Sequence, residues 1–408
     1  MKQIFLVPCL IFGLSTVFDT AYAAESPVPD PFQRFDNSSS YTINYDDLTN
    51  LLKTVVVDTG RSTREKAAPT QAATGTRMKA KVKRSTMNEA NRFYFETFAN
   101  NPEARQLIGA IQKSIEQVPG EVSLEYFSRD EQLAYWLNLY NVTLLNEIIK
   151  VYPQRNLKKL LVGKKSILSK KILNVAGVSL SLDDIQYTIL KNNYNNDPLV
   201  IYGLYQGIIG GPNIRKRAYT GTDVRRALKN NALEFVNSNR GTYSKDEKVF
   251  RVSSFYDRNR VFFPDFKSDL SKHLLTYLEG SEKRELQSAK TLKPDIDDWT
   301  VTDLGGTHRN LGAVFADNNA ALLDSVKGTA SDGNGGVMGA AIGAASTNMA
   351  ASGKPMSRIS PELLVQLQNL NLKRENTNLE NASVTMEELG EATVEPKPDP
   401  DTDNKEDN

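Results

Sequence analysis

Residues 128–153 of the chain read SRDEQLAYWLNLYNVTLLNEIIKVYP. Ser128, followed three residues later by Glu131, is a capping-box pattern that predicts the start of a helix. The Tyr152-Pro153 pair predicts its end. Between these limits the positions are largely aliphatic or aromatic, so we expect the helix to be buried and the fold to form around it.

Two asparagines interrupt this apolar helix. Asn138 lies seven residues after Glu131, nearly eclipsed with it on a helix, and Asn141 lies about 60° away, so the three side chains share one face. A buried amide without a partner costs about 1–3 kcal/mol, so this face must contact polar groups. One interpretation is that the asparagines bind irregular backbone of neighbouring loops. The other is that they line the floor of a ligand pocket. The sequence leaves both open, and we predict the structural role first.

The amino-terminal residues predict export. Lys2 precedes a mostly apolar stretch, residues 4–18, and Ala21-Tyr22-Ala23 fits a signal-peptidase site. We expect residues 1–23 to be a signal peptide, cleaved near Ala23-Ala24, and the mature protein to be periplasmic or secreted without a transmembrane anchor. Cys9 is the only cysteine and lies in this peptide, so we expect no disulfide or thiolate chemistry in the mature chain.

The 408 residues carry a formal net charge of +1, which gives no argument for nucleic acid as a partner. We predict an α+β fold in which helices pack around a small, mainly antiparallel sheet in a single compact domain. The predicted segments are a leader at 24–85, the domain at 86–280, a Gly/Ala/Ser-rich linker at 281–359, an amphipathic helix at 360–379 and an acidic, disordered tail at 380–408.

Local patterns within the domain predict particular elements. Thr86 with Glu89 and Ser181 with Asp184 are capping boxes, and residues 172–182 have the pattern of a hairpin. DPLVIYGLY, residues 197–205, is a continuous apolar run that we interpret as a central strand. RVFF, residues 260–263, is interpreted as another strand, and a helix is expected over 265–278.

Two blocks of sequence resemble a known family. Residues 129–153 and residues 175–204, VAGVSLSLDDIQYTILKNNYNNDPLVIYGL, are similar to the domain of unknown function 547, whose second block has the pattern G-x-x-L-S-L-D-x-I-E followed by a D-P strand. The resemblance extends over about residues 86–278. The family commonly has a histidine at that strand and then a C-x-S-C-P-P-L segment, but here residues 201–212 read IYGLYQGIIGGP.

Of that segment only Pro212 is kept, and Gln206 and Gly210 stand where relatives often have cysteines. The thiol chemistry or Cys/His metal binding that relatives could perform is therefore not expected here, and the resemblance implies no agreed activity. The chain has two histidines, His273 and His308, without metal-binding spacing. We predict no metal and no cofactor, and expect His273 to be a surface or satisfied core residue.

We predict a binding or scaffold module that uses the 205–212 loop and the amide face, because a catalytic nucleophile or well-placed histidine is lacking. The candidate site residues are Glu131, Asn138, Asn141, Tyr205, Gln206 and Tyr219. The ligand could be a small molecule, a peptide or an envelope component, and the oligomeric state stays open.

The alternative is a carboxylate-dependent hydrolase or transferase acting on envelope material. Glu131, Asp183, Asp184 and Asp265 are its candidate acids, although capping explains Asp184 and a solvated first turn explains Asp183. Glu131 discriminates between the two functions. If it lies exposed at the helix start it is only a cap, and if it enters a cleft with Asn138, Tyr205 and Gln206 the enzyme is favoured.

Overall fold

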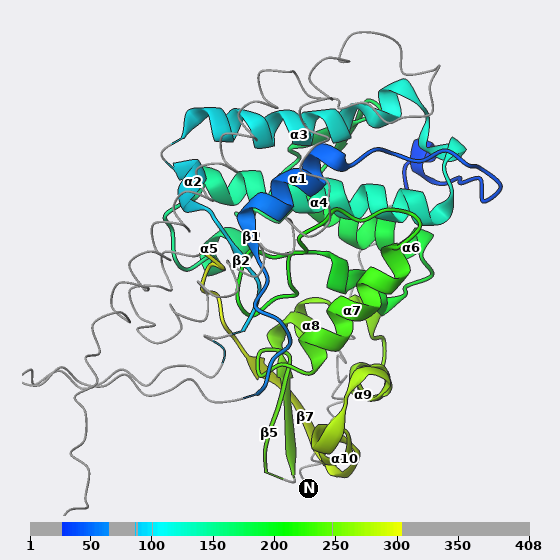
Figure 1. Ribbon diagram of the computed structural model, residues 1–408. Helices are drawn as coiled ribbons and strands as arrows, with labels where there is room; N and C mark the ends of the chain where they lie inside the picture. Colours follow the sequence, from blue (N-terminus) through cyan, green and yellow to red (C-terminus); the bar gives the residue numbers. More distant parts are fainter. Residues whose placement is uncertain (1–26, 65–85, 87–88, 100, 247, 304–408) are drawn as a thin grey trace, which may run out of the picture.

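The computed structural model describes residues 27–64, 86, 89–99, 101–246 and 248–303 (Figure 1). The predicted signal peptide, most of the predicted linker, the predicted helix at 360–379, the acidic tail and His308 lie outside the described residues. Among the described residues, no helix combines the length and the hydropathy that crossing a membrane requires.

The fold is centred on α4 (Arg129–Val151), the helix predicted from the opening stretch. Ser128 accepts a hydrogen bond from the Glu131 amide at 3.2 Å, as a capping residue should, and the helix ends just before Tyr152. Helix α3 (Pro102–Glu121) packs along α4 on one side, and α7 (Val224–Val236) packs on the other (Figure 1). Because α4 is covered from both sides, most of its side chains are buried.

The strands form three small sheets. β1 (Val56–Val57) pairs with β2 (Arg92–Phe93), and β3 (Leu173–Val175) pairs with β4 (Val178–Leu180), both antiparallel. In the third sheet β6 (Val249–Ser253) is central, antiparallel to β5 (Thr242–Asp246) and parallel to β7 (Thr291–Ile296). The α+β class is thus confirmed, but the strands are divided among three sheets because helical segments separate the pairs along the chain.

Short helical elements complete the structure. The remaining α-helices are α1 (Asp46–Val55), α2 (Glu96–Ala99), α5 (Lys158–Leu161), α6 (Lys191–Asn193), α8 (Ser254–Arg258), α9 (Phe266–Tyr277) and α10 (Gly280–Ser288). The 3-10 helices are η1 (Asp30–Phe32), η2 (Leu124–Tyr126), η3 (Ile167–Ser169), η5 (Pro198–Gly203) and η6 (Arg260–Phe262), and η4 (Asp184–Leu190) is a π-helix.

Several local predictions are confirmed and others are wrong. The hairpin, the Ser181–Asp184 capping box and α9 with its Asp265 cap agree with the structure. The run at 197–205 is a 3-10 helix instead of a strand, because the Asp197 side chain accepts from the Leu199 amide at 2.9 Å and Pro198 occupies the first turn. Residues 260–262 are likewise a 3-10 helix.

Thr86 and Glu89 do not cap a helix. The Thr86 hydroxyl donates to Asp298 at 2.7 Å, and the Glu89 carboxylate accepts from the amides of Asn239 and Arg240 at 2.9 and 3.1 Å. Both side chains therefore connect parts of the chain that are more than 140 residues apart in sequence. The pattern was ambiguous because threonine and glutamate side chains can form hydrogen bonds with any nearby backbone amide, not only with those at the start of a helix.

The packed core extends beyond the predicted limits of 86 and 280. Phe32, Leu48 and Leu51 belong to the same buried cluster as α4, so part of the predicted leader is core. At the other end β7 completes the third sheet and Val301 is buried. The residues from 281 to 303 are therefore part of the packed structure, whereas the sequence placed them in the linker.

Candidate functional site

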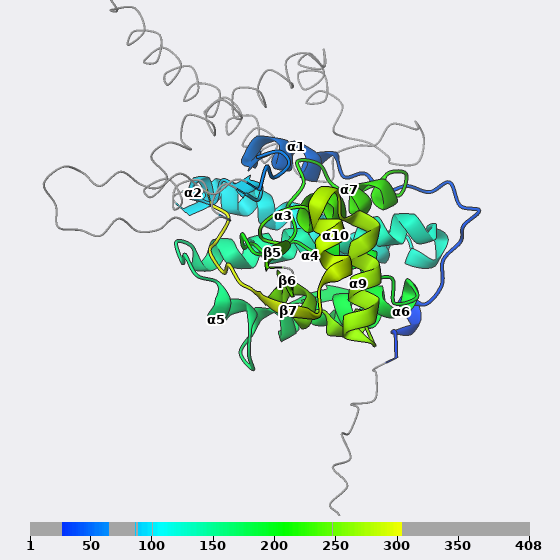
Figure 2. The same cartoon turned by 90° about the horizontal axis from the view of Figure 1, so that it is seen from below.

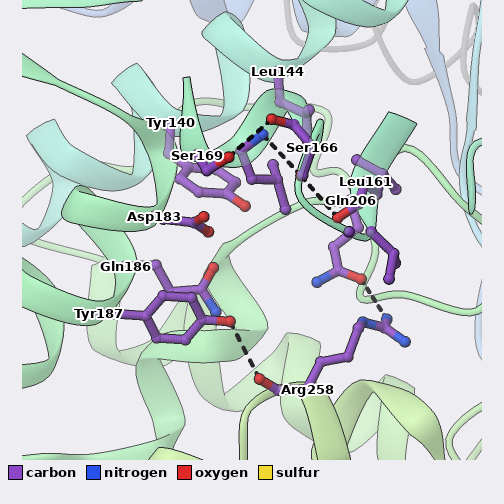
Figure 3. Close-up of a pocket in the computed structure, with 13 residues that line it drawn as sticks. Tyr140, Leu144, Leu161, Ser166, Ser169, Asp183, Gln186, Tyr187, Gln206 and Arg258 are labelled. Carbon is purple, nitrogen blue, oxygen red and sulfur yellow. Dashed lines mark hydrogen bonds between the residues drawn. The ribbon is translucent and has the colours of Figure 1, made fainter. Parts of the chain in front are cut away.

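A cleft of about 280 Å³ lies beside the middle of α4, enclosed by the α5–η3 segment, the start of η4 and the end of α8 (Figure 3). Its lining combines aliphatic side chains with several polar groups. The lining residues are Tyr140, Leu144, Leu161, Val162, Gly163, Ser166, Leu168, Ser169, Asp183, Gln186, Tyr187, Gln206 and Arg258.

Asp183 supplies the carboxylate of the cleft. Its neighbour Asp184 closes the capping box, accepting from the Ser181 amide and from Lys171 Nζ, both at 2.6 Å. Asp183 faces the cleft and has no hydrogen-bond or ion-pair partner among the described residues (Figure 3). Burial, and secondly the negative charge of Asp184, raise the pKa of the Asp183 carboxyl. An unpaired carboxyl in a cleft is a common property of functional sites.

Gln206 supplies an amide whose orientation is fixed by Arg258. The Arg258 Nη2 donates to Gln206 Oε1 at 2.8 Å, and Nη1 donates to Ser254 Oγ at 2.8 Å. The guanidinium also lies 4.5 Å from the ring centroid of Trp299, which holds it in place. Because arginine only donates, Gln206 must present its oxygen to it. The Gln206 Nε2 group is consequently turned toward the cleft, as Figure 3 shows.

Two tyrosines also line the cleft. The Tyr140 side chain is fully buried, and its hydroxyl has no hydrogen-bond partner among the described residues. The Tyr187 hydroxyl donates to the Arg258 carbonyl at 3.2 Å (Figure 3). Burial raises the pKa of Tyr187 to about 12 and that of Tyr140 well above its usual value, so both hydroxyls stay protonated. A buried hydroxyl without a partner is unfavourable unless a ligand or a water molecule forms a hydrogen bond with it.

The cleft can therefore bind polar groups, but it lacks an activated nucleophile. Ser166 Oγ donates to the Leu161 carbonyl at 2.9 Å, and Ser169 Oγ donates to the Ser166 carbonyl at 3.1 Å. Neither hydroxyl is paired with a basic side chain that could remove its proton. Among the residues that the structure describes, no group of three or more His, Cys, Asp or Glu side chains could hold a metal ion.

The predicted amide face is structural. Asn138 donates to the Tyr219 carbonyl at 2.8 Å and accepts from the Tyr219 amide at 2.9 Å. Asn141 does the same with two other backbone groups, donating to the Gly203 carbonyl at 2.9 Å and accepting from the Tyr205 amide at 2.9 Å. Each side chain thus satisfies one donor and one acceptor of irregular backbone, which confirms the first of the two interpretations.

Glu131 fits neither of its two predicted environments. It is buried, and its two carboxylate oxygens accept from the Ile43 amide at 3.0 Å and the Gly221 amide at 2.9 Å. Burial raises the pKa of this carboxyl, while the two backbone hydrogen bonds lower it. Because both oxygens are bound by backbone, Glu131 joins the residues before α1 to the loop before α7 and does not enter the cleft.

Of the six predicted site residues, only Gln206 lines the cleft. Tyr205 is buried with its hydroxyl bonded to Thr302, and the Tyr219 hydroxyl accepts from Asn231 Nδ2 at 3.2 Å. His273 is partly buried, and its Nε2 pairs with the Tyr202 hydroxyl at 2.9 Å. Sequence reasoning named Asp183 but set it aside, and it missed four further residues: Tyr140, Gln186, Tyr187 and Arg258. Gln186, which stands at the acidic position of the G-x-x-L-S-L-D-x-I-E pattern, was one available signal.

Comparison with known proteins supports the family resemblance over part of the chain. The family described as "Protein of unknown function, DUF547" matches residues 124–236. Searches of curated proteins and of solved structures gave no match. The matched region contains α4, η4 and Gln206, and therefore most of the cleft lining, whereas Arg258 lies beyond it.

Proposed function

We propose that this protein is an exported binding module that holds a small polar ligand, or the polar end of a larger envelope component, in the cleft beside α4. The observation that carries the proposal is the unpartnered Tyr140 hydroxyl, buried at the cleft wall. Asp183 adds a hydrogen-bond acceptor and Gln206 Nε2 adds a donor. A ligand can therefore form hydrogen bonds with all three of these groups.

The aliphatic lining suits this role. Leu144, Leu161 and Val162 supply apolar surface around the polar groups. A ligand that buries a hydrocarbon part against these side chains gains affinity from the apolar area, while the polar groups set its orientation.

The test is a thermal-shift screen of the mature chain against cell-wall fragments, short peptides and ester substrates. We expect a binding compound to raise the melting temperature of the wild-type protein. The shift should be lost in Gln206→Leu and Asp183→Asn, and kept in Gln287→Leu, which changes an exposed glutamine on α10. A shift of the same size in all four proteins would place the ligand outside the cleft.

Acid or base chemistry at Asp183 is the second candidate. Its raised pKa in a cleft with neutral tyrosines is the specific observation that favours it over Glu131, whose oxygens are occupied. Turnover of an ester in the same screen, lost in Asp183→Asn and kept in Glu131→Gln, would establish the enzyme. Binding without turnover would refute hydrolysis of these esters and would support the binding function.

Export is a separate part of the proposal, supported by the amino-terminal pattern of the sequence. Amino-terminal sequencing of protein from an envelope fraction should give Ala24 as the first residue. An intact Met1 would refute it.

A further inference from the structure

One wall of the cleft belongs to a strongly basic stretch of surface, residues 155–171, which we call the cationic segment. Its seven basic residues are all exposed: Arg155, Lys158, Lys159, Lys164, Lys165, Lys170 and Lys171. Lys171 pairs with Asp184, but the other six have no ion-pair partner among the described residues. An uncompensated cluster of this size produces a strong positive potential and attracts an anionic partner.

The cationic segment also forms the rim of the cleft. Leu161, Val162 and Gly163 line the cleft, and each lies between the lysines in sequence. The segment carries α5 at the edge of the molecule, away from α9 and α10 (Figure 2). A partner bound to these lysines therefore lies close to residues that line the cleft.

The carboxyl-terminal end of the described chain runs directly beside this segment. The Leu157 amide donates to the Trp299 carbonyl at 3.0 Å, and the Val301 amide donates to the Arg155 carbonyl at 2.8 Å. In Figure 1 the yellow end of the chain reaches α5. The last described residue, Asp303, thus lies two positions after the one that contacts Arg155.

The sequence beyond this point contains a segment of opposite charge. Residues 380–408 have ten acidic residues and two basic ones, Lys397 and Lys405, which gives a formal charge of −8. This nearly balances the seven cations of the cationic segment. Residues 304–379 separate the two. If residues 304–359 act as the flexible linker and residues 360–379 form the helix that the sequence predicts, the root-mean-square span of residues 304–379 is about 50 Å.

We propose that the acidic segment 380–408 docks on the cationic segment 155–171 of its own chain, beside the cleft. The tether gives an effective concentration on the order of millimolar, so a weak electrostatic contact suffices to keep the surface occupied. The docked segment competes with external anions for the lysines. The proposal rests on charge and chain path, and it holds whether or not the cleft binds the ligand proposed above.

The test measures energy transfer between the two segments in the full chain. Ser169→Cys and Thr402→Cys, in a Cys9→Ser background, provide two labelling positions. We expect efficient transfer at about 50 mM salt and at least a two-fold loss at about 1 M salt, where the screening length falls to about 3 Å. The same two-fold loss is expected at low salt when Lys158, Lys159, Lys164 and Lys165 are changed to glutamine.

The matched control changes four exposed lysines outside the segment to glutamine: Lys229, Lys272, Lys283 and Lys290. It alters the total charge equally and should keep the transfer. An equal loss in both variants would show a general charge effect and overturn the docking site. Transfer that appears only when singly labelled chains are mixed would identify a second copy as the occupant, and would overturn the intramolecular contact.

Discussion

Asn138 allows the sharpest test of how the loops are attached to α4. Its amide is the sole side chain that pairs with both backbone groups of Tyr219 in the described structure, through contacts of 2.8 and 2.9 Å. Substitution Asn138→Ala removes both partners at once. Because the site is buried, the Tyr219 amide and carbonyl are left without hydrogen bonds.

The magnitude follows from these two groups. Each buried group left unsatisfied costs about 1–3 kcal/mol, so complete loss of both costs about 2–6 kcal/mol. The neighbouring void, lined by Asn138 and Asn141, holds only about 10 Å³, which is at the lower limit for one water molecule. Removing the amide enlarges it enough for a water to bind one of the two groups. We therefore expect a loss of about 2–4 kcal/mol, a large part of the stability of a typical domain.

The assay is urea unfolding of the mature chain, with Asn146→Ala as control. Asn146 lies on the same helix, but it pairs with another side chain, Gln112, at 2.7 Å in a partly exposed position. Water can replace that partner, so the control should lose no more than about 1 kcal/mol. A loss in Asn138→Ala below about 1 kcal/mol, equal to that of the control, would refute the structural role of the amide.

Three further changes test other parts of the structure. Burial lowers the pKa of His273 in the folded protein to about 4, whereas the pKa of the same histidine in the unfolded chain is 6.5. The unfolded chain therefore binds a proton more readily, and protonation favours unfolding. Unfolding free energy should fall by about 3 kcal/mol as the pH falls from 6.5 to 4, with no further loss from this group below 4, and His273→Phe should remove this slope. Gly221→Ala places a Cβ 2.3 Å from Glu131 Oε2 and 3.0 Å from Glu131 Cα. We expect this clash to lower the free energy of unfolding by about 1–3 kcal/mol in thermal denaturation. The control Gly120→Ala has open space around the added Cβ and should cause no such loss. Ending the chain at residue 280 removes β7 and should abolish cooperative unfolding by urea, whereas ending it at 303 should preserve it, and equal stability of the two would show that β7 is dispensable.

The sequence predicts α4 well because its signals are local. The capping box, the apolar run and the terminal Tyr-Pro pair each act within a few residues, and two amides in such a helix require polar partners wherever the neighbouring chain runs. The run at 197–205 shows the limit of this reasoning. A continuous apolar stretch is compatible with any buried conformation, so its Asp197-Pro198 start, which is also a helix-cap pattern, was the more informative signal.

The cleft was less predictable because it is assembled from distant segments. Tyr140, Gln206 and Arg258 come from parts of the chain more than 50 residues apart, and no spacing in the sequence connects them. Tyr205 and Gln206 illustrate the difficulty, since the two adjacent residues go to opposite environments. Tyr205 packs in the core against Thr302, while Gln206 turns to Arg258 and the cleft. The positions of Thr302 and Arg258, both distant in sequence, decide which of the two residues faces the cleft.

The adjacent acids Asp183 and Asp184 show how a local signal can nevertheless indicate a site. Capping was enough to explain Asp184, and the structure confirms it, because Ser181 and Lys171 bind that carboxylate. The same cap fixes the direction in which the first turn begins, and successive side chains on a helix point about 100° apart. Once Asp184 is directed to the cap and to Lys171, Asp183 has to face another side, which here is the cleft. The assignment of one acid to the cap therefore argued for a different role of its neighbour, and the raised pKa of the Asp183 carboxyl is the physical consequence of the half-buried position that results.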